Sequence, residues 1–241
     1  MEELRTSLRA LVDLDCAAGV YHEAEILEAI EEAIETELGE PSQALLDELT
    51  TRALDALEAR ARDEANWVAR TVNDRIDSAF ADLDARGIVA AQALGFTVQE
   101  GAWLIDRQCG ERAGEVRGSV FYHRQDLERG VAGEGLLLAF TGYAGAAEPA
   151  AIGREIVYVL QHHGVPVAWN GKVQSRIEIP PFTWQKRRVT KAPPGAGPAG
   201  PIPPPAPPPR ACPHCGGRGW VTLDPMRGSE LCACKLRPPA P

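Results

Sequence analysis

A proline-rich stretch near the end of the chain places the strongest limit on how these 241 residues can fold. Residues 192–211 contain ten prolines in twenty positions. A proline fixes the backbone φ angle and has no backbone N–H to donate, so this stretch cannot build a sheet, a helix or a core. We interpret it as a semi-rigid spacer that spans on the order of 60 Å. The PxxP spacing of Pro204 and Pro207 is also typical of ligands of proline-binding domains.

The segment after the spacer, residues 212–241, carries four of the six cysteines. Cys212 and Cys215 form a C-x-x-C pair, and Cys232 and Cys234 form a C-x-C pair. So short a segment cannot build a stable core unaided and usually needs a metal or disulfides. Four thiolates suit a tetrahedral zinc ion. We therefore expect a zinc knuckle that binds one Zn²⁺ through these four cysteines.

Residues 1–66 are predicted to be helical and strongly acidic. Apolar side chains recur at helical spacing over residues 2–15, over 22–38 and from Ser42 onward, with Gly39 as a C-cap between the second and third helices. This part holds 18 acidic and 5 basic residues, a net charge of −13, whereas residues 182–241 hold 9 basic and 2 acidic, a net charge of +7. An acidic surface repels nucleic acid, whereas a basic tail attracts it or the acidic part of the same protein.

Residues 67–191 are predicted to form an α+β domain. A helix is expected from about Thr71 to Ala85, with Asn73 as its N-cap. The pattern that follows favours strands at 88–93, 103–105, 117–122, 135–140, 165–169 and 176–179 and helices at 126–131 and 150–163. The strand, helix and strand at 135–169 are expected to form a right-handed parallel unit, and the hairpin after it makes the sheet mixed. We predict helices over one face of this sheet, with the N-terminal helices beside it.

The predicted strand at 117–122 leads directly into a group of polar side chains. Val120 is expected on one face of the sheet and Phe121 on the other. His123 is a candidate general base, oriented by Asp126 or by Asp74. The alternative is structural: Asp126 caps a short helix with Gln125, and Arg124 pairs with Glu128 across one helical turn.

Other chemically active side chains point less clearly to a site. Cys109 is expected in a polar loop, as an ordinary loop cysteine and not a reactive thiol. The pair His162 and His163 suits a helix end, where the helix dipole favours positive charge. Neither Ser119 nor Ser175 has the partners of a catalytic triad. Four more charged residues are candidates for a buried polar network around His123, namely Arg75, Arg154, Glu155 and Arg176.

Several stretches together resemble an uncharacterised actinobacterial domain family of unknown function. They are residues 73–80, 85–90, 120–129, 152–157, 176–180 and 184–188, and the resemblance extends over about residues 1–188. The family has no known activity, so the resemblance implies domain limits and no chemistry. Residues 212–219 are similar to one C-x-x-C-x-G-x-G repeat of the DnaJ-type zinc domain. Because the C-x-C half departs from that repeat, the resemblance does not imply chaperone-type peptide binding.

These observations favour a non-enzymatic interaction protein with four parts: an acidic helical part (1–66), an α+β domain (67–191), the proline-rich linker (192–211) and a zinc knuckle (212–241). One alternative is a small hydrolase-like enzyme that uses His123 and Asp126. Another is nucleic-acid binding through the basic tail, by side chains at positions that are basic or aromatic, namely Arg218, Trp220, Lys235 and Arg237. We expect a cytoplasmic protein without a membrane segment, because the chain begins without a signal-peptide pattern and has no long apolar run.

Overall fold

The computed structural model describes residues 2–39, 42–112, 114–143 and 148–188, together with the backbone of two short strands at 220–224 and 228–231. The proline-rich linker and the four cysteines that are predicted to bind zinc lie outside the described residues. Up to residue 188, the described chain packs as one compact unit, and the two short strands belong to a second unit. The predicted boundaries between the four parts of the chain stay predictions.

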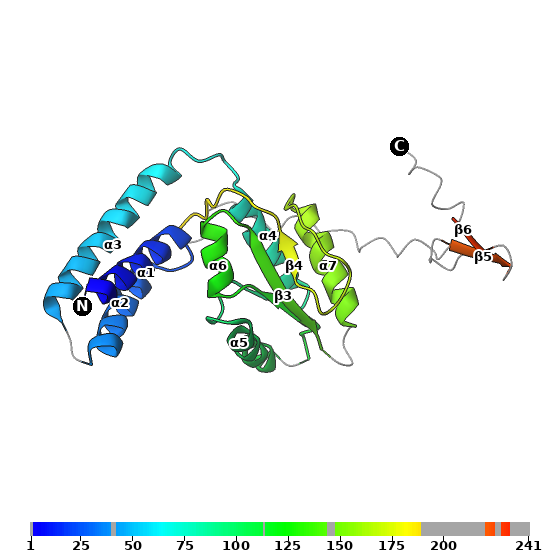
Figure 1. The fold of residues 1–241 in the computed structure, drawn as a ribbon, viewed down its shortest axis with the longest axis horizontal. Coiled ribbons are helices and arrows are strands. Elements are labelled where there is room, and N and C mark those ends of the chain that lie inside the picture. The colour runs from blue at the N-terminus through cyan, green and yellow to red at the C-terminus, as the bar shows by residue number, and fades with distance from the viewer. Residues whose placement is uncertain are drawn as a thin grey trace. The chain divides into compact units, whose positions relative to one another are not determined.

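The first unit is an α+β fold with seven helices and a four-stranded mixed sheet in its described residues (Figure 1). The helices are α1 (Glu2–Ala18), α2 (Glu23–Leu38), α3 (Gln43–Glu64), α4 (Val72–Ala85), α5 (Val98–Glu111), α6 (Arg124–Val131) and α7 (Pro149–His162). The strands are β1 (Ile88–Ala91), β2 (Gly118–Phe121), β3 (Leu136–Gly142) and β4 (Ile177–Ile179). The predicted fold class, α+β with a mixed sheet, is therefore confirmed for this unit.

The strand order is β1-β2-β3-β4, and the only parallel pair among the described strands is β1 with β2. The predicted parallel unit at 135–169 is therefore wrong. After α7 the chain runs through a loop before β4 pairs antiparallel with β3, and the predicted strand at 165–169 contributes a single bridge from Ala168 to Glu178. The crossover helix of the parallel pair is α5, which the sequence analysis missed. Its Thr97 N-cap accepts a hydrogen bond from the Glu100 N–H, and the predicted strand at 103–105 lies inside this helix.

The two faces of the sheet carry different helices, so the prediction of helices over one face is wrong. Val120 packs with α4 and α7 in the main core, whereas Phe121 points to the opposite face, where α5 lies over β1 and β2. This alternation of Val120 and Phe121 agrees with the sequence pattern. A side-chain carbon at Gly101 would overlap the Phe121 ring, so the glycine allows α5 to approach the sheet closely.

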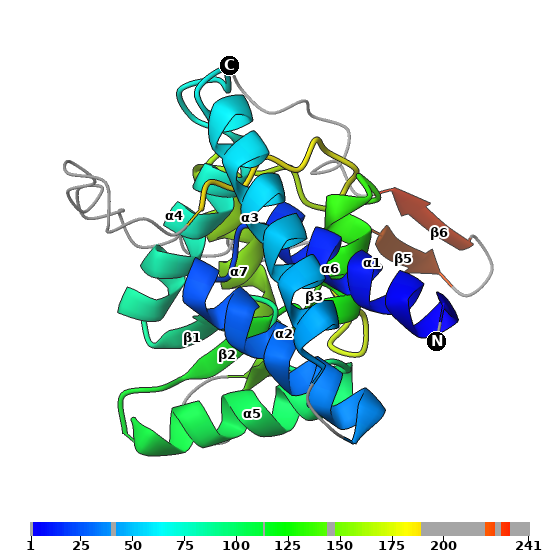
Figure 2. The same cartoon turned by 90° about the vertical axis from the view of Figure 1, so that its left-hand side faces the viewer.

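Helices α1, α2 and α3 pack together beside the sheet (Figures 1 and 2). On α2, Ile26, Ile30 and Ile34 recur at four-residue intervals and are all buried in the core of this bundle. Gly39 ends α2 in the left-handed conformation, as the sequence predicted. The helical bundle thus has an apolar core of its own, separate from the core of the sheet.

The last described residues of the first unit, 182–188, form an extended segment that joins the bundle to the sheet, and we call this segment the strap. The Trp184 indole N–H donates to the carbonyl of Ala18 at the end of α1 (3.0 Å). The Gln185 N–H donates to the side chain of Asn73 (2.7 Å), so Asn73 holds the strap and does not cap α4 as predicted. The strap therefore ties α1 and α4 together through partly buried hydrogen bonds.

Candidate functional site

The polar group after β2 folds around the first turn of α6. His123 is the N-cap of this helix, because its ring Nδ1 accepts a hydrogen bond from the Asp126 backbone N–H (3.3 Å). In return, the Asp126 carboxylate accepts from the His123 backbone N–H (3.5 Å), which completes a capping box. The prediction that Asp126 and Gln125 cap this helix is therefore wrong. Asp126 occupies the third helical position, and the histidine before the helix provides the cap.

This cap fixes the tautomer of the His123 ring. Since Nδ1 accepts a hydrogen bond, the proton of the neutral ring lies on Nε2. Nε2 lies 3.1 Å from Oδ2 of Asp126 and 3.2 Å from Nη1 of Arg176. Both ring nitrogens are therefore engaged, whereas a general base needs a free nitrogen lone pair.

Asp126 is the most enclosed charged group of this cluster, with an exposed fraction of 1%. Its Oδ2 accepts a hydrogen bond from the Arg176 guanidinium (2.8 Å), which reaches it from the residue before β4. Its Oδ1 has no hydrogen-bond partner among the described residues. A buried carboxylate costs several kcal/mol unless it is paired, so the contact with Arg176 is essential to placing Asp126 in this position.

The surroundings of His123 disfavour its protonated form. Burial lowers the pKa of His123, and the neighbouring positive charge of Arg176, whose Nη1 lies 3.2 Å from Nε2, lowers it further. The Asp126 carboxylate acts in the opposite direction but is outweighed. Protonation would also place a proton on Nδ1, where it would face the Asp126 backbone N–H that now donates a hydrogen bond to Nδ1. The folded protein therefore holds His123 neutral.

Arg124, the first residue of α6, connects this cluster to the helical bundle. Its guanidinium donates to Asp15 of α1 (2.6 Å) and to the Tyr21 hydroxyl (3.3 Å). The predicted pair of Arg124 with Glu128 is replaced by these contacts. Burial raises the pKa of Asp15, and Arg124 opposes that rise. Sequence reasoning missed Asp15, although a charged residue among the apolar positions of α1 was a signal for a buried pair.

Of the other charged residues that were predicted to join this network, Arg176 does so. Arg75 donates to the carbonyl of Gly164 instead (3.2 Å), and Glu155 pairs with Arg117 (2.9 Å). Asp74, the alternative partner of His123, accepts from the Thr71 backbone N–H in the capping box of α4. These residues stabilise other parts of the fold, so the cluster is smaller than predicted.

The remaining candidates also have structural roles. Cys109 lies in α5 and is buried against the sheet, not in a polar loop, and burial raises the pKa of its thiol. A thiol of this kind is a weak nucleophile at neutral pH. His163 follows α7 and lies 3.2 Å from Asp82, and Ser175 accepts a hydrogen bond from Asn170 in a turn (2.9 Å). Ser119 lies on the α5 side of the sheet, away from His123.

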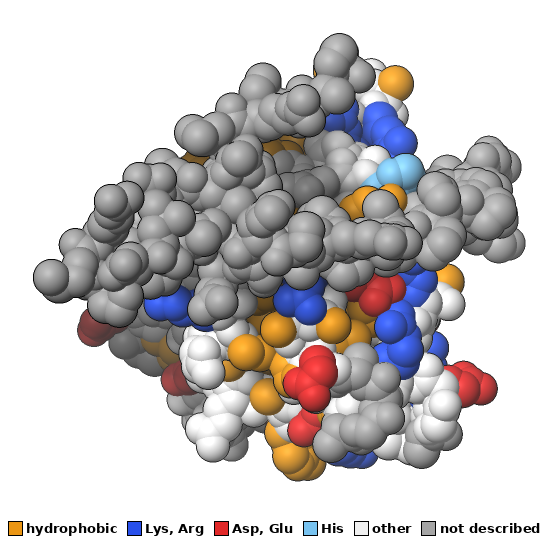
Figure 3. Space-filling model, turned by 90° about the vertical axis from the view of Figure 1, so that its right-hand side faces the viewer, with side chains coloured by type: hydrophobic (Ala, Val, Ile, Leu, Met, Phe, Trp, Pro, Cys, Tyr) orange, Lys and Arg blue, Asp and Glu red, His pale blue; other side chains and the backbone are white. Residues whose placement is uncertain are grey.

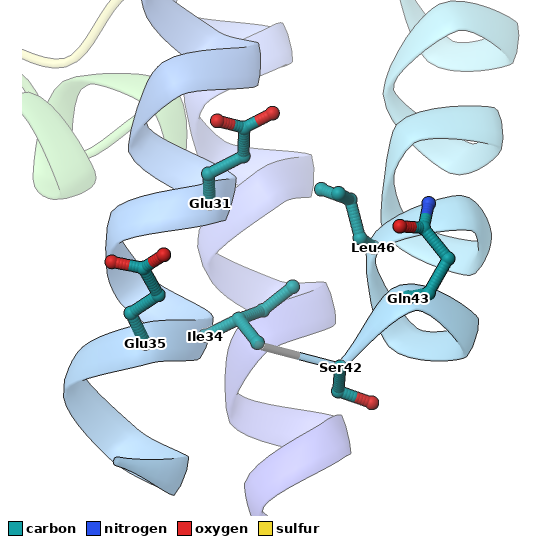
Figure 4. Close-up of a pocket in the computed structure, with 6 residues that line it drawn as sticks. All are labelled: Glu31, Ile34, Glu35, Ser42, Gln43 and Leu46. Carbon is teal, nitrogen blue, oxygen red and sulfur yellow. The ribbon is translucent and has the colours of Figure 1, made fainter. Parts of the chain in front are cut away.

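Neither His123 nor Asp126 lines any of four surface hollows found in the described residues. The smallest, about 240 Å³, lies between α2 and α3 (Figure 4). There Ile34 and Leu46 point toward each other, and Glu31 and Glu35 stand one turn apart on α2. Within the described part of the chain, no group of three or more histidine, cysteine, aspartate or glutamate side chains is arranged to hold a metal ion.

A family described as a domain of unknown function (DUF6891) matches residues 1–188. The chain belongs to the DUF6891 family. The match ends where the strap ends, which agrees with the domain limits expected from the sequence resemblance. Comparisons with curated proteins and with solved structures gave no match.

Membership of the DUF6891 family brings no activity with it, so the chemistry must be argued from the residues. The cluster at α6 is built inside the DUF6891 domain from β2, α6, β4 and α1, and its groups mainly satisfy one another.

No helix in the described residues combines the length and the apolar character needed to cross a bilayer.

The neutral state of His123 predicts a pH dependence of stability. The unfolded chain protonates this histidine near its usual pKa of about 6.5, whereas the folded DUF6891 domain resists protonation, so stability falls as the pH falls below that value. In His123→Asn the cap is kept without a titrating ring. We expect the variant to cost about 1 kcal/mol at pH 7.5 and the difference to shrink at pH 5, measured by urea unfolding. A difference that stays constant across this range would contradict the argument.

The Asp126–Arg176 pair predicts a large cost for removing the charge of Asp126. Asp126→Asn retains the side-chain shape but loses the ionic hydrogen bond of Arg176, and we expect a loss of about 2–3 kcal/mol in unfolding free energy. Asp13→Asn is the matched control, because Asp13 pairs with Arg52 at 2.6 Å on the exposed surface. This control should cost much less. Equal losses of unfolding free energy in the two variants would show that burial of Asp126 does not increase the cost of removing its charge.

Proposed function

We propose that this protein is a non-enzymatic interaction protein that binds a basic amphipathic helix through its N-terminal bundle and carries a zinc-binding C-terminal module. The observation that carries the first part is an apolar groove with an acidic rim on the surface of the bundle. The zinc module rests on the spacing of the four cysteines.

The α6 cluster gives little support to the hydrolase alternative. His123 has an exposed fraction of 4%, and its Nδ1 lone pair already accepts the cap hydrogen bond. Acid–base catalysis needs a group within reach of a substrate, with a nitrogen or oxygen that is free to exchange a proton. Asp126 is enclosed even further and is paired with Arg176. Loss of a defined activity in His123→Ala with an intact fold would restore the enzyme alternative.

The groove lies between α1 and α2, and we call it the α1–α2 groove. Its volume is about 540 Å³. Apolar side chains from both helices form its walls, including Leu4 and Leu11 of α1 and Ala33 of α2. Glu32 and Glu37 of α2 also line it. An open groove between two antiparallel or crossing helices is the kind of surface that accepts the apolar side of a third helix.

The charge of the bundle selects the kind of helix. Helix α2 carries seven glutamates and no lysine or arginine, and residues 1–66 together have a net charge of −13. A helix with apolar residues on one side would bury those residues in the groove. Lysines or arginines on the flanks of the same helix would then lie beside the glutamates. Complementary charge of this kind raises the association rate and disfavours acidic partners.

The second unit supports a zinc site through the register of its two strands. Strand β5 (Trp220–Asp224) pairs antiparallel with β6 (Gly228–Leu231), and Trp220 pairs with Leu231. The C-x-x-C pair precedes β5, and Cys232 directly follows β6. Consecutive Cα atoms are only about 3.8 Å apart, so the paired strands limit the distance between the two cysteine pairs. One metal ion shared by both pairs requires such a limit.

Nucleic-acid binding through the basic tail remains the competing function for this second unit. The side chains on which it depends, those of Arg218, Trp220, Lys235 and Arg237, lie outside the described residues. In the first unit, acidic and basic side chains are interspersed on the face shown in Figure 3. Binding to the tail that weakens steeply with added salt would favour this alternative.

The groove proposal predicts selective binding of an amphipathic cation. The probe is an 18-residue peptide of leucine and lysine with the leucines on one helical face, and its scrambled isomer has the same charge. We expect the amphipathic peptide to bind the full chain at least about tenfold more tightly at physiological salt, because only it presents a continuous apolar face. Isothermal titration calorimetry measures both affinities.

Two matched variants place that binding in the α1–α2 groove. Leu11→Gln replaces a wall of the groove and should weaken the amphipathic peptide about tenfold, which corresponds to roughly 1.4 kcal/mol. Leu54→Gln makes the same change on α3, where Leu54 is exposed and outside the groove, and should leave the affinity unchanged. Equal binding of the two peptides, or equal effects of the two variants, would refute the groove.

The zinc proposal predicts one metal ion per chain. Purified without a metal-chelating tag, the full chain should contain about one zinc by elemental analysis, because a four-thiolate site binds this ion with an apparent ~10–16 kcal/mol. The double variant Cys212→Ser/Cys215→Ser removes half of the donors and should lose the metal. Zinc near zero in the parent chain, or zinc that is unchanged in the double variant, would be incompatible with the assignment.

A further inference from the structure

A cleft of about 300 Å³ lies between α5 and strands β2 and β3, and we call it the α5 cleft. One side is apolar and includes Val98 and Ala102 of α5 and Phe121 and Ala139 of the sheet. At about 30 Å³ for each water-sized group, the cleft has room for a ligand of roughly ten non-hydrogen atoms. It is therefore suited to a small molecule with a compact apolar body.

The other side of the α5 cleft carries a chain of hydroxyl groups that ends at a carboxylate. The Tyr143 hydroxyl donates to Oδ1 of Asp106 (2.8 Å), and Oγ of Ser119 lies 3.4 Å from the Tyr143 oxygen. Burial raises the pKa of Tyr143, so the phenol keeps its proton.

The direction of this chain determines what the cleft offers a ligand. Because the Tyr143 proton points to Asp106, a hydrogen bond between the two hydroxyls must be donated by Ser119. This leaves lone pairs on the Ser119 oxygen and the second carboxylate oxygen of Asp106 as acceptors. Both ends of the polar side therefore favour a ligand that donates hydrogen bonds.

The charges around the cleft act in the same direction. Arg107, the residue next to Asp106, lies over the Trp103 ring with its guanidinium carbon 5.0 Å from the ring centroid. Arg112, the C-cap residue of α5, pairs with Asp84 (2.6 Å). Both cations are thus occupied with other partners, and Asp106 gives the cleft a negative charge.

We propose that the α5 cleft is a binding site for a small primary ammonium ligand with a compact apolar body. The ammonium group donates to Asp106 and Ser119, and the apolar body packs against Ala102, Phe121 and Ala139. A carboxylate or phosphate is excluded because Asp106 would repel it. This site is separate from the α1–α2 groove, so its test is independent of the proposed interaction with a helix.

Three probes of one size distinguish the charge that the cleft prefers. Benzylamine is an ammonium ion at pH 7, benzyl alcohol is its neutral counterpart, and benzoate is its anionic counterpart. Titrations of the ¹⁵N-labelled full chain, followed by amide chemical shifts, should show benzylamine moving the amides of α5, β2 and β3. We expect its affinity to exceed that of benzyl alcohol about fivefold or more, and we expect no shifts there with benzoate.

Three variants connect the affinity to the α5 cleft. Asp106→Asn keeps an acceptor for Tyr143 but removes the charge and should weaken benzylamine about tenfold. Glu111→Gln removes the same charge from an exposed position on α5 outside the cleft and should have little effect. Ala102→Leu fills the cleft and should abolish the shifts while the domain stays folded.

Three results would overturn the proposal. The first is equal affinity for benzylamine in Asp106→Asn and Glu111→Gln. The second is binding of benzyl alcohol or benzoate as tightly as benzylamine. The third is shifts that lie away from α5, β2 and β3, or that survive in Ala102→Leu.

Discussion

The carboxylate of Asp126, enclosed at the start of α6 and paired with Arg176, is the constraint on which the rest of the domain depends. Removing a carboxylate from water is so costly that its partners must arrive together and in good geometry. The His123 ring and the Arg176 guanidinium both lie against Oδ2 of Asp126, so the end of β2, the start of α6 and the start of β4 must meet at one point. Arg124 then connects the same turn to Asp15 of α1. The helical bundle and the sheet are held together here and by the strap.

The sequence predicted much of the local structure, because local structure depends on neighbours in the chain. The helices of the bundle, Gly39 as a C-cap and the alternation of Val120 and Phe121 all follow from spacing or backbone preference. The errors lie where contacts between residues far apart in the chain determine the local structure. The apolar residues at 103–105 suit either a strand or a helix, and the Thr97 cap and the Phe121 ring select the helix. The direction of β4 depends on pairing with β3, which no local pattern encodes.

The polar residues His123, Asp126 and Arg176 do lie together, but the predicted roles of His123 and Asp126 in the helix cap were reversed. His123 and Asp126 are three residues apart, which is the spacing of a capping box. Asp126 was predicted to be the cap because aspartate is a common N-cap residue, whereas the structure places His123 at that position. Asp15 could not be identified as a partner from the sequence, because 109 residues separate it from Arg124. The burial of Asp15 could still have been predicted, because it lies on the same side of α1 as the apolar residues Leu8 and Val12.

Several described arginines hold parts of the fold together, and this has a consequence for the surface. Several donate to backbone carbonyls or buried carboxylates within the fold, among them Arg60, Arg117, Arg124, Arg176 and Arg187. Carboxylates in contrast line the α1–α2 groove and the α5 cleft. Because these cations are used within the fold, they do not neutralise the carboxylates of the groove and the cleft. Both sites are thereby matched to positively charged ligands, one to a helix and the other to a small molecule, although they belong to different elements of the fold.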